Sequence, residues 1–200
     1  MFSPLTDQLI EALCGLPSVG PKSAQRMAFH LLAKANRSTG STLAKALAEA
    51  IDQVDYCHSC RNFSEHTYCP LCQSEKRNRA QICVVETPAD LAAIEATGVY
   101  SGMYYVLHGR LSPLDGIGPE DIALPALLER IDHTQVEEVI LATNPTVEGR
   151  ATAHYIASRI SPGRTQCSRI AHGVPLGGEL EYLDRGTLHH ALESRDKIET

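Results

Sequence analysis

The sequence of 200 residues lacks the long apolar runs, internal repeats and charge blocks that mark several large classes of protein. No apolar stretch approaches the roughly 20 residues that a membrane-spanning helix needs. Residues 1–13 also lack the basic start and the apolar centre of a secretory signal. We therefore expect a globular cytoplasmic protein, and its 43% of hydrophobic residues are enough for one ordinary core with small attached modules.

An overall positive charge is also missing, since the formal net charge is -6. The charge is uneven along the chain. Residues 1–80 contain 9 Lys and Arg against 7 Asp and Glu, a balance of +2, whereas residues 81–200 contain 9 against 17, a balance of -8. A polyanion should therefore bind the N-terminal part, and its affinity should fall steeply with rising salt.

Two acidic residues are missing from a turn where an acid-rich metal site would be expected. The turn is Asn-Pro-Thr-Val-Glu-Gly at residues 144–149. The β-branched and apolar residues 138–143 predict a buried strand before it, and residues 148–159 have the apolar spacing of a helix. Upstream, residues 82–86 predict a second strand, which ends in the acid Glu86 and is followed by another predicted helix.

A strand-end Glu beside a strand-end Asp-x-Asp with a following Glu-Gly resembles the Toprim domain of topoisomerases and bacterial primases, whose acids hold magnesium for phosphodiester chemistry. Glu86, Glu148 and Gly149 match this pattern, but Asn144 and Thr146 stand in the places of the two Asp residues. Hard cations need anionic oxygen ligands. The resemblance therefore implies a Toprim fold that has lost its metal chemistry.

Two alternatives compete with this interpretation. In the first, the segments are ordinary β-α-β units whose strand-end acids only cap helices. Short motifs such as this one recur by chance, so the match alone does not exclude it. A metal-dependent nuclease or primase-like enzyme that uses Glu86 and Glu148 needs further acids nearby, and Asp90 and Asp115 are the plausible recruits.

A hairpin between two short helices is predicted near the N-terminus, over residues 16–26. Leucines at four-residue spacing in residues 5–13 predict the first helix, and Pro17 ends it. Gly20 is expected to supply the permissive backbone of the turn, and Pro21 suits the first turn of the second helix.

Lys22 and Arg26 lie four residues apart and should project together from the second helix, opposite a buried face with Ala24 and Ala28. This arrangement resembles a helix-hairpin-helix, which binds DNA phosphates through backbone N–H groups at the hairpin without reading bases. The usual hairpin has glycine at the position of Ser18. The candidate DNA contacts are one hairpin residue and three helix residues: Gly20, Lys22, Ser23 and Arg26.

Two other interpretations of the hairpin remain. A phosphate-binding P-loop would use Gly15, Gly20 and Lys22, but Pro21 interrupts its spacing and a helix, not a strand, precedes it. Alternatively, Lys22 and Arg26 form an ordinary solvated face of a helical bundle.

Two C-x2-C pairs separated by eight residues follow, and they predict a structural zinc site. The predicted ligands are Cys57, Cys60, Cys69 and Cys72. Four thiolates fill a tetrahedral Zn2+ and leave no position for a substrate. Disulfides, redox pairs, and substitution of one ligand by His58 or His66 are the alternatives. Three further cysteines fall in apolar contexts and are expected in the core: Cys14, Cys83 and Cys167.

The order of these three motifs resembles the RecR family of bacterial recombination mediators, and the resemblance runs essentially end to end. Besides the motifs, it includes residues 108–119, 143–149 and 169–180. The family as a rule has Asn-Pro-Thr at residues 144–146, so the lost acids resemble a family trait. The resemblance implies a DNA-repair factor that acts by binding and not as an enzyme.

The implied partners are DNA, RecO and in some settings RecF, which together load the RecA recombinase onto single strands coated by single-strand-binding protein. The implied assembly is a tetrameric ring joined through N-terminal helical parts and C-terminal segments. Glu86 and Glu148, freed from strong metal binding, become candidate contacts for RecO. Capping of helices or pairing within the domain is the alternative for both acids.

The predicted fold is a multi-module α+β chain. Residues 1–54 form the helix-hairpin-helix domain, residues 55–79 the four-cysteine module, residues 80–173 the Toprim domain with a mainly parallel sheet, and residues 174–200 the oligomerisation segment. Residues 108–119 are expected to form an ordered loop. Residues 174–183 predict either an exchanged C-terminal segment or a plain edge strand.

Overall fold

The computed structural model describes residues 2–161, 163–171 and 173–195 of the chain. The chain forms two compact units, Met1–Val54 and Asp55–Thr200. The fold class is as predicted: a helical N-terminus, a four-cysteine group, a parallel sheet with helices, and a short C-terminal helix. No helix in the described residues is long and apolar enough to cross a membrane.

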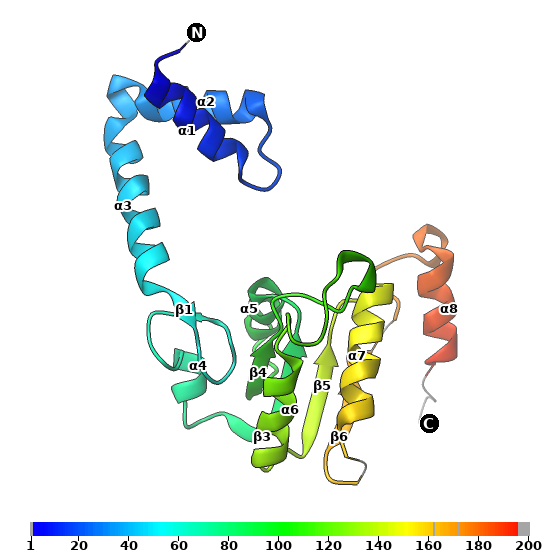
Figure 1. Ribbon diagram of the computed structural model, residues 1–200. Coiled ribbons are helices and arrows are strands. Elements are labelled where there is room, and N and C mark those ends of the chain that lie inside the picture. Colours follow the sequence, from blue (N-terminus) through cyan, green and yellow to red (C-terminus); the bar gives the residue numbers. More distant parts are fainter. Residues whose placement is uncertain (1, 162, 172, 196–200) are drawn as a thin grey trace. The chain divides into compact units, whose positions relative to one another are not determined.

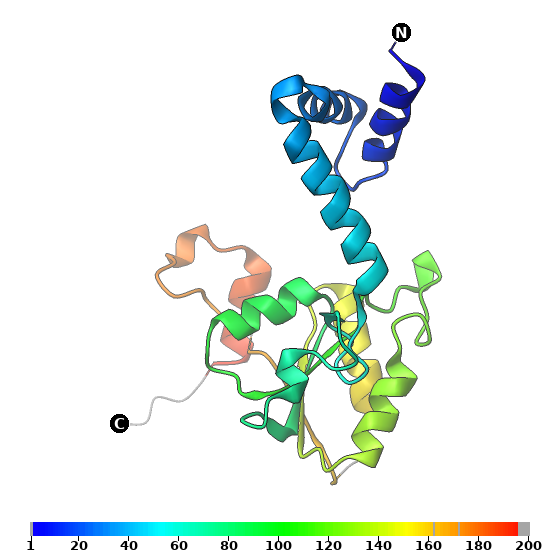
Figure 2. The same ribbon diagram turned by 90° about the vertical axis from the view of Figure 1, so that its left-hand side faces the viewer.

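The N-terminal unit consists of helices alone (Figure 1). Helix α1 spans Pro4–Cys14, α2 spans Pro21–Leu32, the 3-10 turn η1 spans Lys34–Asn36, and α3 spans Arg37–Gln53. Helices α1 and α2 lie against each other on either side of the hairpin, as Figure 2 shows. Ser3 caps α1 by accepting a hydrogen bond from the backbone N–H of Thr6.

The core of this first unit is thin. Among its described residues only Ala24 and Ala28 are fully buried, and both lie on α2 as predicted. Large apolar side chains remain at the surface, with Leu5 exposed by 78% and Ile51 by 74%. Two alanines bury little apolar area, so little hydrophobic stabilisation comes from within the unit.

The second unit begins with the four-cysteine module. A short hairpin pairs β1, Asp55–Tyr56, with β2, Phe63–Ser64, in antiparallel register, and α4 spans Pro70–Gln73. The first C-x2-C pair follows β1 directly, and the second pair lies at the start and within α4.

A four-stranded sheet in the order β4-β3-β5-β6 forms the centre of the second unit, and all its pairs are parallel. The strands are β3 Asn78–Val85, β4 Gly102–Val106, β5 Glu138–Ala142 and β6 Gln166–Arg169. The last four residues of β3 and all of β4 are buried, as expected for strands that are covered on both faces.

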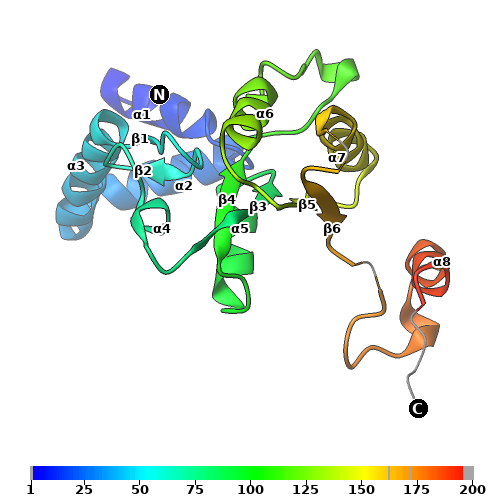
Figure 3. The ribbon, with the colours of Figure 1, turned by 90° about the horizontal axis from the view of Figure 1, so that it is seen from below.

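Helices connect the strands and cover both faces of the sheet. Helix α5, Pro88–Ala96, lies on one face, while α6, Leu124–His133, and α7, Val147–Arg159, lie on the other (Figure 3). This distribution follows from right-handed crossovers, because the chain moves to one side after β3 and to the other side after β4. The reversal places the carboxyl ends of β3 and β5 side by side, where ligand crevices form in such sheets.

The C-terminal part differs from one prediction. Residues 173–183 contain no strand, so the edge-strand alternative is wrong; they run as irregular chain with the 3-10 turn η3 at Leu180–Tyr182. Helix α8, Arg185–Glu193, follows, and the Asp184 carboxylate caps it. Residues 196–200 and His172, which belongs to the segment that carries the family resemblance, lie outside the described residues.

The remaining cysteines fall into three environments. Cys83 is buried in β3, where burial raises the pKa of its thiol to about 12. Cys14 is half-buried. Cys167 is exposed on β6, so its predicted place in the core is wrong: β6 forms the edge of the sheet and presents most of its side chains to solvent.

Candidate functional site: a basic hairpin, a thiolate cluster and a closed Toprim edge

The hairpin between α1 and α2 takes its unusual backbone conformation at Ser18 and not at Gly20. Ser18 has φ +64, in the left-handed region that favours glycine. Gly20 has φ -86 and ψ 169, which any residue adopts, so the predicted conformational role of Gly20 is wrong. Apart from Gly20 itself and its two chain neighbours, no heavy atom lies within 4 Å of the place where a Cβ of Gly20 would stand, so the backbone there is open to an approaching group.

The N-terminus of α2 has the features of an anion-binding site. No side chain caps it, and the backbone N–H groups of Lys22 and Ser23 have no hydrogen-bond partner among the described residues. Unpaired N–H groups and the helix dipole favour negative charge at this end. Lys22 and Arg26 are both exposed on this helix, and neither forms an ion pair within the described chain. A helix precedes the hairpin, which removes the P-loop alternative.

The four predicted ligands come together as one cluster. The Sγ atoms of Cys57, Cys60, Cys69 and Cys72 all lie within 4.8 Å of one another, and all four residues are buried. His58 and His66 are not part of the group. In the described part of the chain this is the only group of three or more His, Cys, Asp or Glu residues with ligand atoms this close.

A backbone hydrogen bond closes the turn formed by each C-x2-C pair, which is called a knuckle. Arg61 N–H donates to Cys57 O at 2.8 Å, and Gln73 N–H donates to Cys69 O at 3.1 Å, so each C-x2-C pair closes on itself. Inside the cluster, a hydrogen bond from the Cys60 thiol lowers the pKa of Cys72 to about 5, while the same bond raises that of Cys60. Cys72 is therefore the thiol that is shifted toward thiolate, the form that binds metal, whereas burial raises the pKa of Cys69.

Hydrogen bonds attach the four-cysteine cluster to strand β4 of the parallel sheet. The backbone N–H of Val106 donates to Cys60 O at 2.8 Å. Arg130 of α6 donates from Nη1 to Ser59 O at 2.6 Å and to Tyr104 O at 3.1 Å, which ties the first knuckle and the strand to one guanidinium. Burial lowers the pKa of Arg130, and the negative charge of nearby Cys72 and Cys60 opposes this shift. Nothing in the sequence pattern singled out Arg130, because it looks like one surface residue of an amphipathic helix.

The Toprim edge is closed by Glu86. Its side chain is only 2% exposed, and its carboxylate accepts hydrogen bonds from Asn144 N at 2.8 Å and Asn144 Nδ2 at 2.9 Å. Arg110 Nη1 approaches Glu86 Oε2 at 3.9 Å. The amide that replaces an expected metal-binding acid thus binds the remaining acid directly. Glu86 pairs within its own domain, as one of the two alternatives predicted.

The turn after β5 is built around this contact. Thr146 caps α7 by accepting from Gly149 N at 3.0 Å, and Thr143 Oγ1 donates to Gly149 O at 2.8 Å. Thr146 therefore serves as a helix cap at the place of the second missing acid. A Cβ on Gly149 would overlap the carbonyl oxygen of Asn144 and lie 2.7 Å from Glu86 Oε1. Only glycine fits this position.

The acids that a metal-dependent enzyme would recruit are engaged elsewhere. Asp90 closes a capping box with Thr87 at the start of α5, and Asp115 accepts from Ser112 Oγ at 2.6 Å in the loop 108–119. Glu148 is half-buried in the first turn of α7, and its side chain has no hydrogen-bond partner within the described chain. The geometry does not gather the acids that the nuclease or primase alternative requires.

These features define a class of protein: a helical hairpin with exposed basic residues, joined to a four-cysteine module and a parallel sheet covered by helices. Family models match the chain as a Toprim domain over residues 80–171, as "RecR, helix-hairpin-helix" over residues 6–51, and as "RecR, C-terminal" over residues 173–195.

Two curated relatives extend the match over the full length. "Recombination protein RecR" of Coxiella burnetii is 60% identical over 199 residues, which cover 100% of this chain and 99% of the relative. "Recombination protein RecR" of Saccharophagus degradans is 54% identical over 198 residues, covering 99% and 100%. The chain belongs to the RecR family.

Replacement of Gly149 by alanine tests the closed edge. Helix propensity alone favours alanine by about 1 kcal/mol, whereas the overlap with Asn144 O must move the turn or Glu86. We expect the overlap to dominate and Gly149→Ala to lower the free energy of unfolding by about 2–4 kcal/mol in urea titrations. Gly118→Ala, whose nearest neighbour is Asp121 Oδ2 at 3.6 Å, is the matched control. Equal stability of both variants would contradict the tight packing of this turn.

Proposed function

We propose that this protein is a DNA-binding recombination mediator in DNA repair that acts by binding and not by making or breaking bonds. It works with RecO, and in some settings RecF, to load RecA onto single-stranded DNA coated by single-strand-binding protein. The cytoplasm is the compartment in which it acts. Full-length identity to recombination proteins supports the general role, and the Asn144 amide bonded to Glu86 supports the absence of metal-dependent catalysis.

The observation that carries the DNA-binding part is the uncapped N-terminus of α2 with two exposed cations beside it. Its free N–H groups can receive a phosphate, and Lys22 and Arg26 add charge that does not discriminate between bases. Open backbone at Gly20 and the backbone N–H group of Ser23 support the same proposal.

Removing the two cations tests this proposal. Lys22→Ala and Arg26→Ala should weaken binding to DNA about equally for all sequences, and each should reduce the slope of log K against log salt by about 1. The fold should remain intact, since both side chains are exposed. Fluorescence anisotropy at several salt concentrations measures both quantities, with Lys45→Ala on α3 as a control that removes an exposed lysine. A double variant that binds DNA like the parent would refute the hairpin site.

The second part of the proposal assigns Zn2+ to the four-cysteine cluster. Four buried thiolates within 4.8 Å suit a tetrahedral Zn–S geometry, and no ligand position remains for a substrate. The metal would hold the knuckles together and, through the Cys60 carbonyl and Arg130, hold the module against β4. Its role is structural.

Loss of one ligand tests the metal assignment. Zinc binding by four thiolates contributes on the order of 10 kcal/mol to local folding, so Cys72→Ser should remove the metal and unfold the module. Cys167→Ser, at an exposed cysteine outside the cluster, should keep both metal and melting temperature. Elemental analysis of the purified protein should give about one zinc per chain; a metal-free chain whose melting curve ignores chelators would rule the assignment out.

The third part concerns assembly. We propose a homotetrameric ring joined by the N-terminal helices and by the C-terminal segment. The thin core of the first unit supports this, because an apolar groove of about 520 Å³ runs between α1, α2 and α3 with Leu9, Leu13 and Leu47 among its walls. The C-terminal segment also exposes large apolar side chains, including Leu176 and Tyr182. Exposed apolar surface of this kind marks interfaces.

Ring formation predicts topological retention on DNA. Several weak hairpins on one closed ring share a high effective concentration, so closed circular DNA should hold the protein longer than linear DNA of equal length once salt is raised. We expect a tetramer built from two kinds of two-fold interface, and light scattering at micromolar concentration should give the mass of four chains. A monomer, or equal release from circular and linear DNA, would leave only a conventional DNA-binding protein.

Glu148 remains a proposed contact for RecO, and the buried Glu86 is proposed to position the surface beside it. Of the two, Glu148 has the more accessible carboxylate, whereas Glu86 acts on the surface by holding Asn144 and Arg110 in place. Co-purification with RecO, with and without gapped DNA, measures the partnership, and Glu148→Gln should reduce it. Unchanged recovery of RecO with that variant would remove Glu148 from the interface.

A further inference from the structure

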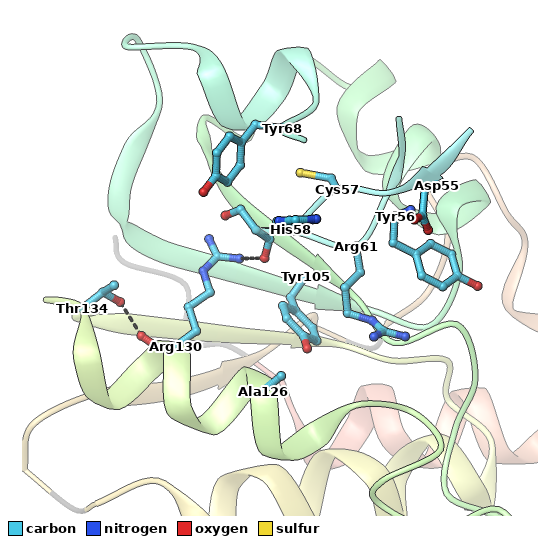
Figure 4. A pocket seen from close by; sticks show the side chains of 11 residues that line it. Asp55, Tyr56, Cys57, His58, Arg61, Tyr68, Tyr105, Ala126, Arg130 and Thr134 are labelled. Atoms are coloured by element: carbon cyan, nitrogen blue, oxygen red, sulfur yellow. Dashed lines mark hydrogen bonds between the residues drawn. The ribbon is translucent and has the colours of Figure 1, made fainter. Parts of the chain in front are cut away.

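A pocket of about 650 Å³ lies between the four-cysteine module and helix α6, within the second unit (Figure 4). Side chains of the module form one wall, and residues of β4 and α6 form the other. None of the DNA contacts proposed above belongs to it. Its lining consists of Asp55, Tyr56, Cys57, His58, Ser59, Arg61, Tyr68, Tyr105, Ala126, Arg130 and Thr134.

The composition of this lining favours a flat polar ligand over an apolar one. It contains three tyrosines, two arginines and a histidine, and it includes no Leu, Ile, Val or Met. The groove of the N-terminal unit is the opposite case, with leucines along its walls. Aromatic rings together with guanidinium groups are the surfaces on which unpaired nucleobases stack, whereas docked helices and peptides call for aliphatic walls.

One aromatic ring of the lining is available to a ligand. Tyr68 is 48% exposed, whereas Tyr56, although 41% exposed, already packs against Phe63, His108 and Arg61. The Tyr68 ring makes one edge-on contact, with His58 at 6.2 Å between ring centroids, and its side chain forms no hydrogen bond within the described chain. A base can therefore stack on it without displacing an internal partner.

The two arginines of the pocket have guanidinium N–H groups that donate no hydrogen bond within the described chain. Arg61 lies over the Tyr56 ring at 5.1 Å and uses only Nε, in a hydrogen bond to Val106 O. Arg130 uses only Nη1, for its two carbonyl partners. Asp55 is the one carboxylate in the lining, and it accepts a hydrogen bond from Tyr56 N at 2.6 Å. Guanidinium groups with free N–H donors beside aromatic rings suit a phosphate attached to a stacked base.

We propose that this pocket binds an unpaired base of single-stranded DNA together with its phosphate. The inference rests on the DNA-binding function proposed above and extends it, because the hairpin of the first unit contacts phosphates in any DNA, whereas this pocket requires a base that is free to stack. It gives the protein a preference for single strands that the hairpin cannot supply.

Substitutions at Tyr68 separate stacking from general apolar contact. Tyr68→Phe keeps the ring, and Tyr68→Leu keeps apolar area but removes the ring. We expect Tyr68→Leu to weaken binding of the full-length protein to single-stranded oligonucleotide about tenfold, with duplex binding unchanged and with Tyr68→Phe close to the parent. A 2-aminopurine in the oligonucleotide reports stacking directly, since its fluorescence should fall on binding to the parent and less on binding to Tyr68→Leu.

A second pair of variants leaves the four-cysteine module untouched. Ala126 is exposed on α6 and lines the pocket, so Ala126→Glu places an acid against the bound phosphate. Ala92→Glu makes the same change at an exposed position of α5 outside the pocket. We expect only Ala126→Glu to weaken single-strand binding, again by about tenfold, with melting temperature and zinc content equal in both.

The possible results separate this site from the function on which it rests. If the parent binds single strands and both Tyr68→Leu and Ala126→Glu bind them equally well, the pocket is not a DNA site while the hairpin proposal stands. If these variants lose RecO instead of DNA, the pocket is a protein-docking site and the inference is overturned. A parent that binds neither single strands nor duplex would overturn the proposed function together with the pocket.

Discussion

A buried carboxylate must be paired, and the pairing of Glu86 determines what the Toprim edge of this protein can be. Removing a charged group from water costs several kcal/mol unless hydrogen bonds or opposite charge replace the lost hydration. A bound cation is one group that can serve that purpose. Here both donors of Asn144 do so, at 2.8 and 2.9 Å, with Arg110 at 3.9 Å. The contact draws the turn after β5 so close that residue 149 has no room for a side chain.

Glu86 is engaged with Asn144, and other surfaces of the protein remain as candidates for its function. The features that remain are an uncapped helix N-terminus with two cations, a thiolate cluster fixed to β4, and apolar grooves without an internal partner. Each of them is a binding feature. The first unit has a thin core, since two buried alanines contribute little hydrophobic stabilisation, and this is consistent with the assembly proposed above.

The sequence predicted those parts of the structure that local chemistry determines. Regular cysteine spacing predicted the cluster, strand-end positions predicted that Glu86 lies beside the turn that contains Asn144, and Pro21 marked the start of α2. Features that depend on packing were missed. Gly20 was assigned the turn conformation that Ser18 adopts, because composition indicates that a tight turn exists but not which residue takes the positive φ. Arg130 and the pocket beside it depend on α6 meeting the four-cysteine module, which no periodicity reveals.

The attachment of the four-cysteine module to the sheet explains why a structural metal can matter for recognition. Tyr56, His58 and Arg61 lie on the first knuckle or next to it, and their positions depend on Cys57 and Cys60. Tyr105 and Arg130 form the opposite wall and are positioned by β4 and α6. The pocket therefore exists only when the knuckle is closed and docked. A structural metal that does not itself contact DNA would in this way set the geometry of the proposed DNA pocket. It would do so by holding the wall formed by the four-cysteine module against the wall formed by β4 and α6.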